Sequence, residues 1–170
     1  MANDLPSILI ALGANLPSER FGPPINALEA ALAVLEQRGV RICRRSRWYE
    51  SAPVPASDQP WYVNGVVEAT TLLGPEPLLR LLHEIESAFG RVRREVNAPR
   101  TLDLDLIAYG DLVRTEAAPI LPHPRMAERA FVLIPLLDVR PDWRHPVLNR
   151  TAAELAAALP GDQAIRLAKS

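Results

Sequence analysis

Hydrophobic and polar residues alternate most clearly between positions 101 and 109, which predicts a β-strand with one apolar and one polar side. Three leucines share one side of this strand, and Asp103 and Asp105 project from the other. Aspartate is depleted in strands, and two carboxylates at i and i+2 lie only roughly 7 Å apart. A divalent cation would relieve their repulsion, and Mg²⁺ is commonly held by one or two carboxylates together with substrate phosphates. The alternative is an edge strand whose polar side is solvated.

The other periodicities predict alternating strands and helices. Apolar or β-branched runs predict strands at 7–12, 40–51 and 61–72, with a short strand near 112–114. Helical spacing predicts helices at 26–38, 75–89, 126–137 and 152–159, with Asn26 as the cap of the first helix. The order strand–helix–strand–strand–helix–strand predicts an α/β (α+β) fold, a ferredoxin-like split βαβ sandwich. It has a mainly antiparallel sheet flanked by helices, with C-terminal additions.

Composition limits the classes of protein to consider. The 170 residues suit a single domain over 1–170, with a core at about 6–160. A net charge of −1 argues against a general binder of polyanions, so an anion site has to be a local cluster of arginines. Cys43 is the only cysteine, which excludes a disulfide framework. The chain starts without a basic leader and has no apolar run of membrane-spanning length, so we expect a cytoplasmic protein.

An arginine-rich segment leads directly into the strand that carries the two aspartates. It contains Arg91, Arg93, Arg94 and Arg100. Guanidinium groups beside a carboxylate metal site are what a polyphosphate requires, because cations and metal together neutralise its charge. The alternative is a solvated, highly charged turn. The glycine-rich signatures GxxxxGK[ST] and GxGxxG are absent, so a P-loop does not hold the phosphates.

Two further polar groups stand near the strands. His123, Arg125 and Arg129 follow the aspartate strand, where the histidine is either a catalytic group or a structural hydrogen-bonding group. Glu86, taken alone, is interpreted as a solvated surface acid of the second helix.

Aromatic and amide side chains gather at the start of the third predicted strand. Gln59, Tyr62 and Asn64 lie within six residues of one another. A flat heterocycle with several donors and acceptors suits an aromatic face beside an amide. The alternative is ordinary strand packing with an amide on the turn.

Together these motifs resemble one family, the 6-hydroxymethyl-7,8-dihydropterin pyrophosphokinases of folate biosynthesis. The most specific part is Pro-Arg-Thr-Leu-Asp-Leu-Asp-Leu at 99–106, followed by Pro-His-Pro-Arg at 122–125 and Arg-x-Phe at 129–131. Weaker matches cover most of the chain in order, at 11–16, 49–53, 58–64 and 86–93.

The resemblance implies Mg-dependent transfer of pyrophosphate from ATP to the pterin hydroxymethyl group, leaving AMP. It implies that Asp103 and Asp105 hold two Mg²⁺ ions and are catalytic together with Arg91, Arg93 and Arg100. The implied ATP contacts are Glu86, Arg91, Arg100, Leu106, His123 and Arg129. The implied pterin contacts are Ser51, Ala52, Val54, Tyr62, Asn64 and Phe131. We expect a monomer that binds neither nucleic acid nor membrane.

One departure from the family pattern falls in the arginine-rich segment. Asn97 stands where many members carry an aromatic residue, and the segment is one residue shorter than in some members. Three other functions remain open from the sequence. They are a simple kinase that gives ADP, an RNA-binding sheet, which needs exposed aromatics and a broad basic face, and an inactive nucleotide-binding relative.

Overall fold

The computed structural model describes residues 4–53, 55–90 and 101–169. Its strands are β1 (Ile8–Ala14), β2 (Val40–Arg45), β3 (Tyr49–Ser51), β4 (Tyr62–Thr71), β5 (Asp103–Tyr109) and β6 (Ile165–Leu167). Its helices are α1 (Pro24–Gln37), α2 (Pro75–Ala88), α3 (Ala130–Val139) and α4 (Ala152–Ala157), with a 3₁₀ turn η1 at Met126–Glu128. Up to β5 the order of strands and helices agrees with the prediction, except that two strands, β2 and β3, stand where one was predicted.

The strands form one sheet in the order β5-β1-β4-β3-β6, and β2 also pairs with β4. The pairings of these strands are antiparallel. The first strand therefore lies inside the sheet, between the edge strand β5 and the central strand β4. This arrangement confirms the predicted mixed α/β class with an antiparallel sheet flanked by helices.

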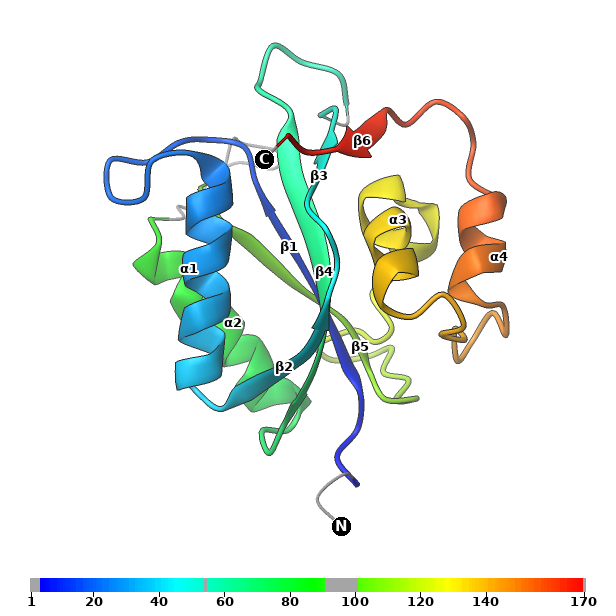
Figure 1. The fold of residues 1–170 in the computed structure, drawn as a ribbon. Helices are drawn as coiled ribbons and strands as arrows, with labels where there is room; N and C mark the ends of the chain where they lie inside the picture. The colour runs from blue at the N-terminus through cyan, green and yellow to red at the C-terminus, as the bar shows by residue number, and fades with distance from the viewer. Residues whose placement is uncertain (1–3, 54, 91–100, 170) are drawn as a thin grey trace.

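Helices cover both faces of the sheet, α1 and α2 on one side and α3 and α4 on the other (Figure 1). The side chains of β1 divide between the two layers. Ile8, Ile10 and Leu12 belong to the core under α1 and α2, and Leu9 and Ala11 belong to the core under α3 and α4. Because successive strand residues point to opposite faces, one strand contributes to two cores.

The prediction of a single strand at 40–51 is wrong, because these residues form two strands, β2 and β3. The break lies at Ser46, whose Oγ accepts the Val66 N–H at 3.0 Å in place of a strand carbonyl. The Trp48 ring then packs on β4 at Gly65, where an added Cβ would lie 2.5 Å from the ring. The pattern of hydrophobic residues does not reveal this break, because it carries no information on a side-chain hydroxyl that replaces a backbone acceptor.

Several predicted boundaries also need correction. Asn26 does not cap the first helix, which begins at Pro24, and its Nδ2 donates to the Phe21 carbonyl instead. No strand forms at 112–114, where the structure has only an isolated bridge from Arg114 to Leu121. The helix predicted at 126–137 is the 3₁₀ turn η1 followed by α3, with Arg129 extended between them.

The sequence prediction also missed β6. This strand has three residues, with two apolar side chains around Arg166. Such a run is too short for its alternation to be distinguished from a loop. β6 pairs with β3 and so extends the sheet beyond the split βαβ unit.

Candidate functional site

Strand β5 places Asp103 and Asp105 together on the face covered by α3 and α4. Asp105 pairs with Ala11 of β1, which belongs to the core of that face, and Asp103 pairs with Gly13. Leu104, between them, is buried in the opposite core. Both aspartates are half-buried, so their carboxylates have access to solvent and to a ligand.

The histidine and an arginine from beyond β5 lie close enough to this pair for their charges to interact. Burial lowers the pKa of Arg129, while the carboxylates of Asp105 and Asp103 act in the opposite direction. Burial, and then the positive charge of Arg129, lower the pKa of His123 to about 4, against a smaller opposing effect of Asp103. His123 is therefore neutral at pH 7.

The hydrogen bonds of His123 define which nitrogen carries its proton. Nδ1 accepts the Arg125 backbone N–H at 3.2 Å. In the neutral ring the proton then belongs to Nε2, which is left as a donor. A neutral imidazole donor beside a cationic guanidinium is suited to an anionic oxygen.

Glu86 is buried, so its interpretation as a solvated surface acid is wrong. Glu86 is only 1 % exposed, and its Oε2 accepts the Leu104 backbone N–H at 2.8 Å. The carboxylate thus ties α2 to the backbone of β5 between the two aspartates. Helical periodicity places Glu86 on α2, but only the packing against β5 reveals its burial.

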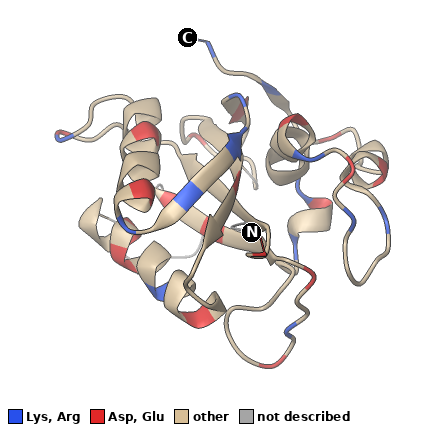
Figure 2. Cartoon of the chain, turned by 60° about the horizontal axis from the view of Figure 1, so that its bottom comes forward, with Lys and Arg blue, Asp and Glu red and all other residues tan. Residues whose placement is uncertain are grey.

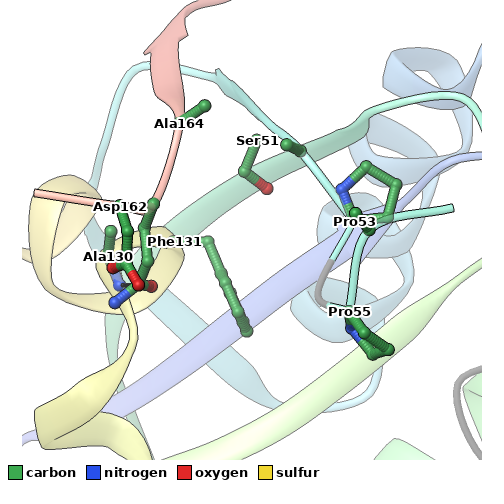
Figure 3. A pocket seen from close by; sticks show the side chains of 10 residues that line it. Ser51, Pro53, Pro55, Ala130, Phe131, Asp162 and Ala164 are labelled. Carbon is green, nitrogen blue, oxygen red and sulfur yellow. Dashed lines mark hydrogen bonds between the residues drawn. The ribbon is translucent and has the colours of Figure 1, made fainter.

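A cavity of about 260 Å³ lies on the same side of the sheet as the aspartates. It is lined by Ser51, Ala52, Pro53, Pro55, Ala56, Ala130, Phe131, Asp162, Gln163 and Ala164. The Phe131 ring extends across it, with Ala130 and Asp162 on one side and Pro55 on the other (Figure 3). Its volume is just below the ~300–1,000 Å³ of pockets for drug-sized ligands, so it suits a small ring system.

Asn64 connects this cavity to the aspartate strand. Its Oδ1 accepts a short hydrogen bond from the Ser51 hydroxyl. Asn64 pairs across the sheet with Gly13, and Gly13 pairs with Asp103. An added Cβ at Gly13 would lie 3.0 Å from Asn64 Nδ2, so the glycine makes room for the amide. The strand predicted at 7–12 ends before Gly13, whereas β1 includes it.

Arg129 joins the two parts of the site. Its guanidinium carbon lies 5.3 Å from the centroid of the Phe131 ring, while its charge interacts with both aspartates. A guanidinium at this distance is attracted to the face of an aromatic ring. The aromatic wall of the cavity and the carboxylate pair are therefore neighbours across one cationic side chain.

The remaining predicted residues are placed as follows. Tyr62 is half-buried at the start of β4, opposite Ser51. Gln59 Oε1 accepts from Asn15 Nδ2 at 2.9 Å, which attaches the proline-rich loop to the end of β1. Leu106 has its side chain in the core under α1 and α2, so only its backbone can reach the aspartate side. Outside the described residues lie Val54, Arg91, Arg93, Arg94, Asn97 and Arg100.

The donor set of β5 fits a hard divalent cation. Two carboxylates project from one strand face, and the described residues contain no group of three or more His, Cys, Asp or Glu side chains suited to a metal. Such a pair matches Mg²⁺, which keeps water and substrate oxygens in its coordination sphere. It does not match a closed structural site of the kind that holds zinc.

The chain matches the family model described as 7,8-dihydro-6-hydroxymethylpterin-pyrophosphokinase (HPPK) over residues 9–141. It is 42% identical over 148 residues to the 2-amino-4-hydroxy-6-hydroxymethyldihydropteridine pyrophosphokinase of Synechocystis, covering 86% of this chain and 73% of the relative. The Pseudomonas aeruginosa protein of that name is 40% identical, with 94% and 96% covered.

Other relatives are much longer than this chain. The folic acid synthesis protein fol1 of Pneumocystis carinii is 39% identical, and the match covers 88% of this chain but 20% of that protein. A Plasmodium falciparum HPPK-DHPS crystallised with pterin and p-hydroxybenzoate has a TM-score of 0.71 at 15% identity, covering 92% of this chain and 44% of that one. The solved structure supports the fold alone.

Proposed function

Because the chain belongs to the 7,8-dihydro-6-hydroxymethylpterin-pyrophosphokinase family, we propose that it makes the pterin diphosphate of folate biosynthesis. The pterin hydroxyl oxygen attacks the β-phosphorus of ATP, and the bond from that phosphorus to the oxygen bridging the α- and β-phosphates breaks. AMP leaves with the bridging oxygen, and the hydroxyl proton is lost to solvent. The β- and γ-phosphates move together, which distinguishes the reaction from that of a simple kinase.

The position of Arg129 carries this proposal. A reaction between a flat heterocycle and a triphosphate needs the two binding sites to meet at the reacting atoms. The Arg129 guanidinium lies over the Phe131 ring of the cavity and interacts electrostatically with Asp103 and Asp105. A ring held against Phe131 would therefore present its substituent to the phosphate side.

Asp103 and Asp105 are the residues that would hold Mg²⁺, and two ions are proposed. When bound, the metal neutralises the charge of the triphosphate and of the transferring group. Both carboxylates share one strand face and are half-buried. The buried Glu86 supports this geometry, because it fixes the Leu104 N–H between them.

The phosphates would be contacted by His123 and Arg129. Neutral His123 has Nε2–H available as a donor, because Nδ1 accepts the Arg125 N–H. Arg129 adds a positive charge that stays close to the developing negative charge in the transition state. Arg91, Arg93 and Arg100 are proposed to complete this set, with Glu86 and the Leu106 backbone on the nucleotide side.

The pterin would occupy the cavity of about 260 Å³ against Phe131. Asn64, which is hydrogen-bonded to the cavity-lining Ser51, would supply an amide for the donor–acceptor edge of the pterin. Ala52 lines the cavity, and Tyr62 lies opposite Ser51 in the adjacent strand. Val54 belongs to the proposed set on the resemblance alone.

The RNA-binding alternative needs a broad basic face. Lys and Arg are interspersed with Asp and Glu along the chain (Figure 2), and the net charge is −1. This distribution favours a small anionic ligand at a local cluster over a long polyanion. None of the described helices is long and apolar enough to cross a membrane. The cytoplasmic location and the monomeric state stay predictions.

The direct test is an analysis of nucleotide products. The full chain is incubated with ATP, Mg²⁺ and 6-hydroxymethyl-7,8-dihydropterin, and the nucleotides are separated by chromatography. We expect AMP in an amount equal to the pterin diphosphate formed, and none without pterin. Pterin-dependent ADP would identify a simple kinase, and binding without turnover would identify an inactive relative. Either result would contradict the proposal.

A further inference from the structure

The C-terminal segment that follows α4 returns to the sheet and closes one end of the cavity. Its strand β6 pairs with β3 from Tyr49 to Ser51. Just before β6, the Ala164 carbonyl accepts the Ala52 N–H at 3.1 Å. Residues 162–164 line the cavity, with Ala164 beside Ser51 and Asp162 beside Ala130 (Figure 3). A segment outside the matched family region, which ends at residue 141, thus contributes to the site.

Gln163 of this segment holds the start of α3 with both ends of its amide. Oε1 accepts the Ala130 N–H at 2.8 Å, and Nε2 donates to the Glu128 carbonyl at 2.8 Å. The two bonds bracket Arg129, the extended residue between η1 and α3. The side chain of Arg129 does not cap the helix. Gln163, 33 positions after Ala130, instead supplies the acceptor for the first helical N–H.

We propose that Gln163 is a positioning residue for the pterin site, acting through the backbone at 128–130 on the Phe131 ring. This inference rests on the proposed function. Helix α3 begins at Ala130, and Phe131 is its second residue, so the direction of the ring follows from how the first turn is held. Without the amide, the Ala130 N–H loses its acceptor and this turn loses its attachment to the cavity wall.

The effect of Gln163 should be selective between the two substrates. Phe131 has a short side chain with two rotatable bonds, so a shift of its backbone moves the ring directly. Arg129 is long and flexible, and its guanidinium can return to the phosphates after a small backbone shift. Pterin binding should therefore depend on Gln163 more strongly than ATP binding does.

The test uses Gln163→Ala in the full chain, with Gln37→Ala, on the exposed end of α1, as a matched control. We expect the Kd for the pterin to rise about tenfold, because the first turn of α3, no longer held by the amide, has to be ordered when the pterin binds. The Kd for ATP and kcat at saturating pterin should stay within about twofold, so KM for the pterin carries the change. The control should match the wild type in every measurement.

Gln163→Glu keeps the test decisive if the alanine variant does not fold. The carboxylate can still accept the Ala130 N–H but cannot donate to the Glu128 carbonyl. We expect partial rescue, with the Kd for the pterin raised about threefold. Wild-type pterin affinity in both variants would overturn the inference, as would equal weakening of pterin and ATP binding. A wild-type chain that does not bind the pterin would instead refute the proposed function itself.

Discussion

The two faces of the sheet are built from the same strands but differ in what they bury. Under α1 and α2 the strand side chains are apolar, with Leu104 and Leu106 of β5 fully inside. On the opposite face, the same strand presents Asp103 and Asp105, next to a cavity and two basic side chains. On the proposed function, neighbouring residues of one strand would serve stability and ligand binding separately.

This separation has a physical reason. A carboxylate pair is costly to bury without compensation, so it stands where helix α3 leaves part of the sheet accessible. The face under α1 and α2 carries the larger of the two apolar cores, which stabilises the sheet beneath the accessible carboxylates. Substitutions on the two faces should accordingly change different measurements.

The largest effect is expected from Asp105→Ala on the polar face. Pyrophosphoryl transfer should fall by roughly 10³-fold, because one of the two metal-binding carboxylates is removed. The thermal unfolding midpoint without ligand should stay close to that of the wild type, because removing a like-charged neighbour of Asp103 offsets the lost attraction to Arg129. Steady-state kinetics and calorimetry give both values. Retained activity with a large loss of stability would show that the pair is structural.

Leu104, next to Asp105, should show the opposite result, a loss of stability with turnover retained. Leu104→Ala should lower the free energy of unfolding by about 2–5 kcal/mol, the cost of a cavity in a packed core. The folded fraction should keep a kcat close to that of the wild type, since the side chain points away from the site. Denaturant unfolding measures the first value, and turnover per folded molecule measures the second. A selective loss of kcat at unchanged stability would break the distinction between the two faces.

A smaller effect is expected from Asn64→Ala, next to the cavity-lining Ser51. The Kd for the pterin should rise about tenfold, because an amide that pairs with the pterin edge is lost and Ser51 loses its acceptor. The Kd for ATP should change little. Fluorescence titration with each substrate separates the two. Equal effects on both would remove Asn64 from the pterin site.

The smallest effect concerns pH and His123. Its pKa is about 4 in the folded protein against 6.5 for an ordinary histidine, so protonation favours the unfolded chain. The stability from this group is complete above about pH 6.5 and is lost as the pH falls towards 4. Denaturant unfolding of wild type and His123→Gln across this window should show a shallower decline in the variant. Equal slopes would contradict the assigned pKa. Burial also lowers the pKa of His145, so both proteins keep some decline.

The sequence was sufficient for features that depend on local periodicity. The alternation around Asp103 and Asp105 predicted both the strand and their shared side, and the order of elements predicted the sheet. Features that depend on contacts between distant segments were not accessible. Glu86 is buried because β5 lies against α2, and Gln163 reaches α3 from 33 residues away. The strand predicted at 7–12 ends before Gly13, because a glycine indicates a turn more often than space for a neighbouring amide.

The most direct test of the account follows the bond that breaks. The wild-type protein is given Mg²⁺, the pterin, and ATP with ¹⁸O at the position bridging the α- and β-phosphates, and the products are analysed by mass spectrometry. Attack at the β-phosphorus predicts that the label is found in AMP and is absent from the pterin diphosphate. Label in ADP would show attack at the γ-phosphorus, and label in pyrophosphate would show attack at the α-phosphorus. Either would contradict transfer of the β- and γ-phosphates as a unit.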